Sequence, residues 1–303
     1  MSSDESSFYI TLPSNGKQFE ENTLNNFRVR LPQRLNLEGQ WDVALIEAIY
    51  PQTWLNFRPT IDDKISELVI HIAVPYETET KASALYVAQI PIAIPTNYYN
   101  TPARLINALN LAIDQKTAQE YQNYSKFVKD LYGKPSRNTF TSLARFSFDT
   151  LTNRACIAIT AGENIVEKLR LSPRMSYVLG FGRNKYTILD KDWVLDTESI
   201  KIRWAEYPPD MRAGLYVLYV YCSIVEKQIV GDSLVPLLAK MPVSGEYDSV
   251  VHYICNQPLY IPLVRTDIDT IEIALKDDTN NGISFQYGKV ILTLHFRKRS
   301  TFL

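Results

Sequence analysis

NFRVRL, residues 26–31, sets the rhythm of this chain, because apolar Phe27, Val29 and Leu31 alternate with polar and charged neighbours. An alternation of period two predicts a β-strand with one buried face. The same pattern recurs at residues 68–74, 271–275 and 290–296. Two other segments are apolar on both faces and are therefore predicted to be central strands, at residues 41–50 and 215–225.

Turn-forming residues divide several of these segments. Asp149, Thr150 and Asn153 separate two alternating runs between residues 146 and 159, which predicts a hairpin. A second hairpin is predicted from Thr270 to Phe296, because the loop at residues 277–282 is rich in Asp, Asn and Gly. The strands therefore follow one another as antiparallel neighbours.

Helices are fewer and are marked by their caps. Thr101 followed by Pro102 predicts a helix start, with Leu105, Leu109, Ala112 and Ile113 on one face and Gly133 as the stop. The more polar second half of this helix reaches Tyr124 and Phe127. Residues 165–171 are predicted to form a second helix. A third is predicted to begin at Ser172 and end at Gly180, with Met175, Val178 and Leu179 buried.

Many short strands with a few helices between them favour an all-β fold. We predict a single jelly-roll antiparallel β-sandwich with helical insertions in the loops. Residues 1–25 are assigned to an N-terminal arm and lead-in, and residues 299–303 to a C-terminal tail. Residues 26–298 are assigned to one jelly-roll domain, with helical insertions near residues 100–140 and 162–212.

The composition is that of an ordinary globular protein, with 46% hydrophobic and 21% charged residues among 303. A net charge of -1 gives no global support for binding a polyanion. Cys156, Cys222 and Cys255 are widely spaced among apolar neighbours, which predicts reduced, buried thiols and assembly inside the cell. The polar start lacks a signal peptide's pattern, and no membrane span is predicted.

Ser233 in GDSLV, residues 231–235, resembles the nucleophile segment of a serine hydrolase. A nucleophilic serine needs a histidine base and a group that orients it. Only His252 and His295 follow it, and Ser249 and Leu292 stand three residues before them instead of aspartate. A turn is therefore the favoured interpretation, and an esterase is kept only as a rival.

Other chemical signals are also weak. A metal site on a jelly roll needs clustered ligands, whereas the three histidines are far apart. His71 and His295 are predicted on outer strand faces, and His252 is not placed. The loop from Asp277 resembles the first half of an EF-hand, but Thr279 and Gly288 replace carboxylate ligands. No catalytic residue, cofactor-binding residue or metal ligand is assigned, so no enzyme activity and no cofactor are predicted.

Paired acids, a basic cluster and the tyrosines are three further candidates for a functional role. The paired acids Asp62 with Asp63, and Asp190 with Asp192, are interpreted as solvated loop charge. Arg297-Lys298-Arg299 is interpreted first as a basic end, with contact to nucleic acid as the alternative. The 19 tyrosines predict protein contact surface, and those in expected loops or insertions are the best candidates: Tyr98, Tyr99, Tyr124 and Tyr186.

Six strings in order carry a resemblance to a known family. They are residues 27–32 (FRVRLP), 41–51 (WDVALIEAIYP), 179–181 (LGF), 210–222 (DMRAGLYVLYVYC), 229–238 (IVGDSLVPLL) and 285–290 (FQYGKV). Together they span nearly the whole chain and resemble the minor capsid, or penton, proteins of Maverick/Polinton elements and related virophages. One departure is that Ala239 precedes Lys240, where the family commonly has Arg directly after Leu-Leu.

The resemblance implies a non-enzymatic virion protein at the capsid vertices. It implies a jelly roll that assembles as a homopentamer at the fivefold vertices of an icosahedral shell, against a double-jelly-roll major capsid protein. Assembly is expected inside the host cell, in the cytoplasm, with the basic tail in weak contact with packaged DNA. The alternative from a different class is a glycan-binding β-sandwich, because jelly rolls also serve as lectins and exposed aromatic rings stack on sugars.

Overall fold

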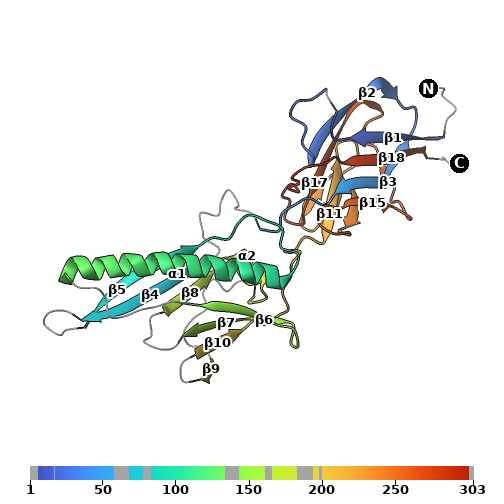
Figure 1. The fold of residues 1–303 in the computed structure, drawn as a ribbon. Coiled ribbons are helices and arrows are strands. Elements are labelled where there is room, and N and C mark those ends of the chain that lie inside the picture. The colour runs from blue at the N-terminus through green and yellow to red at the C-terminus, as the bar shows by residue number, and fades with distance from the viewer. Residues whose placement is uncertain are drawn as a thin grey trace. The chain divides into compact units, whose positions relative to one another are not determined.

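The computed structural model describes residues 6–16, 18–57, 68–77, 83–133, 143–160, 166–182, 194–197 and 200–299. The chain divides into two compact units. Unit 1 comprises residues 1–55 and 215–303, and unit 2 comprises residues 56–214. Figure 1 shows the strands and helices of each unit. Each unit has its own hydrophobic core. The sequence predicted one jelly-roll domain over residues 26–298, and these boundaries differ from the division that the structure has.

Unit 1 consists of two antiparallel sheets. The first sheet has the order β1-β18-β3-β15, with β16 paired to one end of β3. Its strands are β1 (Ser7–Pro13), β18 (Ile291–Lys298), β3 (Trp41–Pro51), β15 (Val250–Ile254) and β16 (Ile261–Pro262). The second sheet has the order β14-β11-β17-β2. Its strands are β14 (Leu237–Pro242), β11 (Val217–Cys222), β17 (Asp267–Lys276) and β2 (Asn26–Asn36).

The strand order is that of a jelly roll. Apart from β16 and the small β12–β13 ribbon, unit 1 has eight strands, which we letter B to I in chain order. The first sheet then has the strand order B-I-D-G and the second the order C-H-E-F. Strands adjacent in sequence thus lie mostly in opposite sheets, which is the pattern of two interlocked Greek keys. The predicted fold class, all-β with antiparallel sheets, is confirmed.

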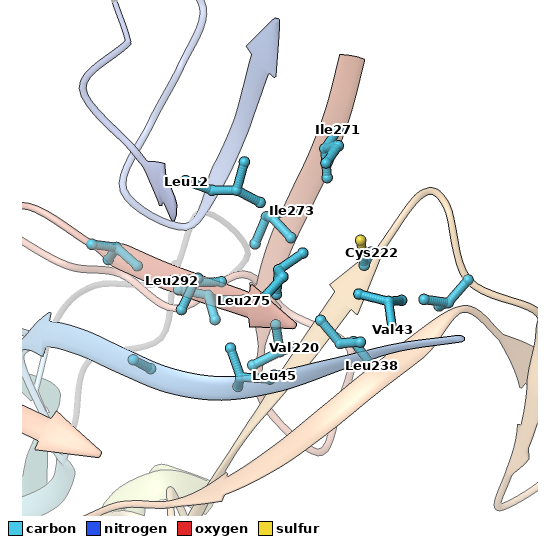
Figure 2. Close-up of a cluster of buried hydrophobic side chains, with 14 of the residues drawn as sticks. Leu12, Val43, Leu45, Val220, Cys222, Leu238, Ile271, Ile273, Leu275 and Leu292 are labelled. Atoms are coloured by element: carbon cyan, nitrogen blue, oxygen red, sulfur yellow. The ribbon is translucent and has the colours of Figure 1, made fainter. Parts of the chain in front are cut away.

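Alternating side chains from both sheets fill the space between them. Leu45 and Leu292 from the first sheet and Ile273, Leu275 and Val220 from the second are at most 2% exposed. Figure 2 shows these side chains pointing toward one another between the strands. β3 is buried along most of both faces, as its apolar sequence predicted.

Unit 2 is also mainly antiparallel β-structure, with one long helix. One sheet has the order β5-β4-β8, from β5 (Ser83–Ile92), β4 (Leu68–Glu77) and β8 (Val166–Leu171). The other has the order β6-β7-β10-β9, from β6 (Arg145–Asp149), β7 (Arg154–Thr160), β10 (Ile200–Trp204) and β9 (Val194–Thr197). The helices are α1 (Pro102–Tyr132) and α2 (Pro173–Val178).

The caps that the sequence indicated are confirmed. Thr101 accepts a hydrogen bond from the amide of Arg104 at the start of α1, and Gly133 ends the helix with a φ of 68°. Ser172 caps α2 in the same way through Met175. Gly180 follows α2 with a φ of 84°, and a Cβ there would lie 2.0 Å from the carbonyl oxygen of Tyr207.

Two sequence predictions were wrong. Residues 166–171 form strand β8 rather than a helix, because their backbone pairs antiparallel with β4. The run from Thr270 to Phe296 is no hairpin: β17 pairs with β11 and β2, whereas β18 pairs with β1 and β3 in the other sheet. The arm assigned to residues 1–25 contains β1, an edge strand of the first sheet. The hairpin of β6 and β7 is confirmed.

Leu292→Ala should lower the free energy of unfolding by about 2–5 kcal/mol, because it leaves a cavity between the two sheets. Leu292 is fully buried, whereas Leu234 is 61% exposed and provides the matched control. Leu234→Ala should change the same free energy by less than about 0.5 kcal/mol. Urea unfolding followed by circular dichroism measures both, and equal losses would contradict the packing described for unit 1.

Candidate assembly surface

Ser233 lies next to the turn of a tight hairpin. β12 (Gln228–Val230) and β13 (Ser233–Val235) pair antiparallel, with Val230 opposite Ser233 and Gly231 and Asp232 as the two turn residues. The Ser233 hydroxyl donates a hydrogen bond to the neighbouring Asp232 carboxylate at 3.1 Å. The turn interpretation of GDSLV is therefore confirmed.

The three histidines occupy different places. His71 lies on β4 in unit 2, and His295 lies on β18 in unit 1, each on the outer side of its sheet as predicted. His252, which the sequence left unplaced, lies on β15 and its Nε2 is 2.7 Å from Glu47 Oε1. His252 and His295 thus share one sheet face, although 43 residues separate them.

We call this face the β3 surface: the outward side chains of β1, β18, β3 and β15 together with Tyr260. At one end of it, the Tyr9 ring stacks on His295 with centroids 4.5 Å apart. The Tyr260 hydroxyl is 2.7 Å from His295 Nδ1, and the Arg297 guanidinium lies 3.4 Å from the Tyr260 ring centroid. His295 Nε2 is buried and has no hydrogen-bond partner among the described residues. Burial, and secondarily the charge of Arg297, lowers the pKa of His295.

Two carboxylates on β3 are held by neighbours on the same surface. Glu47 receives a 2.9 Å hydrogen bond from the Thr293 hydroxyl in addition to its contact with His252. The hydrogen bond with His252, followed by that from Thr293, lowers the pKa of Glu47. The side chain of Asp42 is only 9% exposed and accepts a 2.7 Å hydrogen bond from Arg299 Nε. Acid and base are therefore paired within the surface.

The basic end at residues 297–299, for which contact with nucleic acid was the alternative interpretation, is partly paired with Asp42. Arg299 pairs with it directly, and Arg297 is 3.9 Å from its second oxygen. Lys298 is exposed. Contact with DNA stays a prediction.

Large apolar side chains stand around these paired charges. On the β3 surface Tyr9 is 63% exposed, Val250 72% and Ile254 59%. A sheet face that combines exposed apolar groups with internally compensated charges can be covered by another protein without leaving an unpaired ion. The β3 surface therefore has the chemistry of an interface.

Unit 2 contains a second surface with exposed apolar side chains, and this one carries no charge. β5 is an edge strand whose strand partner among the described residues is β4, and Leu85 and Val87 on its outer side are 58% and 64% exposed. Residues 82–103 contain no Asp, Glu, Lys or Arg. Edge strands usually carry charge that discourages pairing, so an uncharged one is suited to contact.

The tyrosines expected at contact surfaces are distributed differently. Tyr99 and Tyr124 are buried in the core of unit 2, at 5% and 1% exposure, so their assignment to contact surface was wrong. Tyr98 is partly buried. Tyr186 lies outside the described residues. Sequence reasoning missed Tyr9 and Tyr260, although Tyr9 alternates with Phe8 and Ile10 in a strand-like pattern.

The remaining polar features have local roles or fall outside the structure. Asp277 Oδ1 accepts hydrogen bonds from the amides of Thr279 and Asn281, so it closes its own loop. The paired acids at residues 62–63 and at 190 and 192 lie outside the described residues. Within the described ranges no cluster of three or more His, Cys, Asp or Glu side chains is arranged to hold a metal ion.

Two of the three cysteines are buried as predicted. Cys156 and Cys222 are buried and unpaired with another cysteine, while Cys255 is partly exposed. Burial raises the pKa of Cys222 to about 12. No helix in the described part of the chain is both long and apolar enough to cross a bilayer.

Fold and surface together define a jelly-roll β-protein with an exposed, charge-compensated sheet face. Solved structures similar to it include the mavirus penton protein, at 8% identity over 97% of this chain and 100% of the other, with a TM-score of 0.46. A chain of the Sputnik virophage cryo-EM structure is 10% identical over 97% and 98%, with a TM-score of 0.49. No protein-family model matches the chain, and no curated protein matches it in sequence.

Acid should destabilise the fold through His295. Because the pKa of this histidine is lowered in the folded protein, the unfolded chain takes up the proton first, near its usual value of about 6.5. The free energy of unfolding should therefore fall as pH falls from about 6.5 toward the folded-state pKa. His295→Gln should flatten this slope, measured by urea unfolding between pH 7.5 and 5.5. An unchanged slope would show that the ring titrates normally.

Proposed function

We propose that this chain is a structural minor capsid (penton) protein without catalytic activity. It assembles as a homopentamer and occupies the fivefold vertices of an icosahedral virion, in contact with a double-jelly-roll major capsid protein. The pentamer forms inside the host cell, in the cytoplasm. The basic end at residues 297–299 makes at most a weak contact with packaged DNA, since Asp42 already pairs with two of its side chains.

The observation that carries this proposal is the position of the six family-like strings. Residues 27–32 lie in β2, residues 41–51 coincide with β3, and residues 210–222 lead into and include β11. Residues 229–238 run from β12 into β14, and residues 285–290 lead into β18. Five of the six strings thus lie in or next to strands of unit 1, and only residues 179–181 lie wholly in unit 2.

The surfaces support a role in self-association. A closed ring of five requires heterologous contacts, in which one flank of each copy meets a different flank of its neighbour. The β3 surface and the uncharged β5 edge are two distinct flanks of this kind. Exposed apolar side chains with compensated charge fit a contact of long lifetime.

Purified protein should form rings with fivefold symmetry. Negative-stain imaging with class averaging gives the symmetry, and sedimentation velocity gives the mass of the particle. A monomer that persists at high protein concentration, also in the presence of the major capsid protein, would falsify the proposed role.

Val250→Lys should weaken ring formation by about tenfold or more, because an ammonium would have to be buried unpaired, at a cost above roughly 1.4 kcal/mol. Val250 is 72% exposed in the single chain, so the thermal melt should stay unchanged. Leu151→Lys is the matched control, at a residue 94% exposed in the turn between β6 and β7. Rings of Val250→Lys as stable as those of the control would exclude the β3 surface from the contact.

A further inference from the structure

A hollow of about 310 Å³ opens on the outer side of the second sheet of unit 1. Its floor is formed by β11 and β17, and the chain leaving the β12–β13 hairpin forms one wall. It is lined by Tyr221, Cys222, Ser223, Val235, Pro236, Glu272, Ala274, Lys276 and Asn280. This volume is at the lower end of the range for small-molecule sites, roughly 300–1,000 Å³.

The polar groups of the hollow retain unused hydrogen-bonding capacity. No ion pair or hydrogen bond within the described residues occupies the Glu272 carboxylate, while its amide donates to Ser223 Oγ at 3.0 Å. Lys276 Nζ donates to Asn280 Oδ1 at 2.9 Å and lies 5.4 Å from the Tyr221 ring centroid. An ammonium has three donor hydrogens and a side-chain amide has two, so donors remain beside the open acceptor.

The charge balance narrows the class of ligand. Glu272 and Lys276 are the charged groups in the lining, one of each sign. The Glu272 carboxylate would repel a phosphate. The Lys276 ammonium would repel a divalent cation, and Glu272 would be its single acidic ligand. A neutral ligand that presents both donors and acceptors satisfies Glu272, Lys276 and Asn280 together.

We propose that this hollow binds a neutral saccharide. Sugar hydroxyls both donate and accept, so they can pair with the carboxylate and with the remaining N–H groups. The C–H face of the sugar ring packs on Pro236, Val235 and the exposed part of Tyr221. This site is separate from the assembly contact and does not depend on the vertex role, although a ring of five would strengthen binding to a glycan-coated surface through multivalency.

The test uses the full chain on a glycan array, followed by saturation-transfer NMR with the free sugars that score highest. Glu272→Ala should reduce binding by about tenfold or more, because it removes a hydrogen bond to a charged group. Ala274→Phe should abolish binding by filling the hollow from its floor. Thr270→Phe is the matched control, since it adds the same ring four residues away on the same outer face of β17, and it should bind as the wild type does.

Two outcomes would overturn the proposal. One is an array and NMR spectra without any bound sugar for the wild-type protein. The other is binding that survives both Glu272→Ala and Ala274→Phe, which would locate the sugar elsewhere. Negative-stain images of the same samples distinguish the two functions. Rings without sugar binding would refute this inference alone. Sugar binding without rings would refute the assembly role alone.

Discussion

The fold of unit 1 depends on one constraint. The inner faces of its two sheets are apolar along their length, and they are shielded from water because they pack against each other. Leu292 and Leu294 on β18 and Ile271 and Ile273 on β17 are fully buried in this way. Such burial contributes roughly 1.5–3 kcal/mol for each large side chain. A slip of one residue in any strand would turn its apolar set outward, so the same burial fixes the register.

The connection between β3 and β11 contains the whole of unit 2. These strands lie in opposite sheets, and the jelly roll closes its core with residues from unit 1 alone. Because the entropy of closing a loop grows only slowly with its length, a long insertion costs the host fold little. Unit 2 in turn buries a separate core around α1, including Leu105, Leu109 and Tyr124. One chain can therefore present two independent sets of surfaces.

Local patterns in the sequence predicted individual helices and strands better than they predicted which strands pair. The alternation in residues 26–31 and the caps Thr101 and Ser172 identified β2, α1 and α2, because these signals depend on neighbouring residues. The pairing of β17 and β18 depends on which edges are already occupied, and no short-range pattern carries that information. β8 was mistaken for a helix since Val166 and Leu169 are spaced as on one face of a helix, although Leu169 and Leu171 are spaced as on one face of a strand. The β3 surface was unpredictable for the same reason: it joins Tyr9, His252 and His295 from three strands.

The β3 surface differs from an ordinary solvated face because its carboxylates are paired with side chains of the same surface. On most surfaces carboxylates and cations are hydrated by water and screened by salt. Burying such an ion in an interface without a partner costs several kcal/mol. Here Glu47 already contacts His252 and Thr293, and Asp42 already contacts Arg299. Asp42, whose side chain is 9% exposed, has therefore already lost most of its water within the single chain, and the exposed apolar side chains would gain from burial. A surface of this kind, with exposed apolar side chains between paired charges, has the composition of a protein contact.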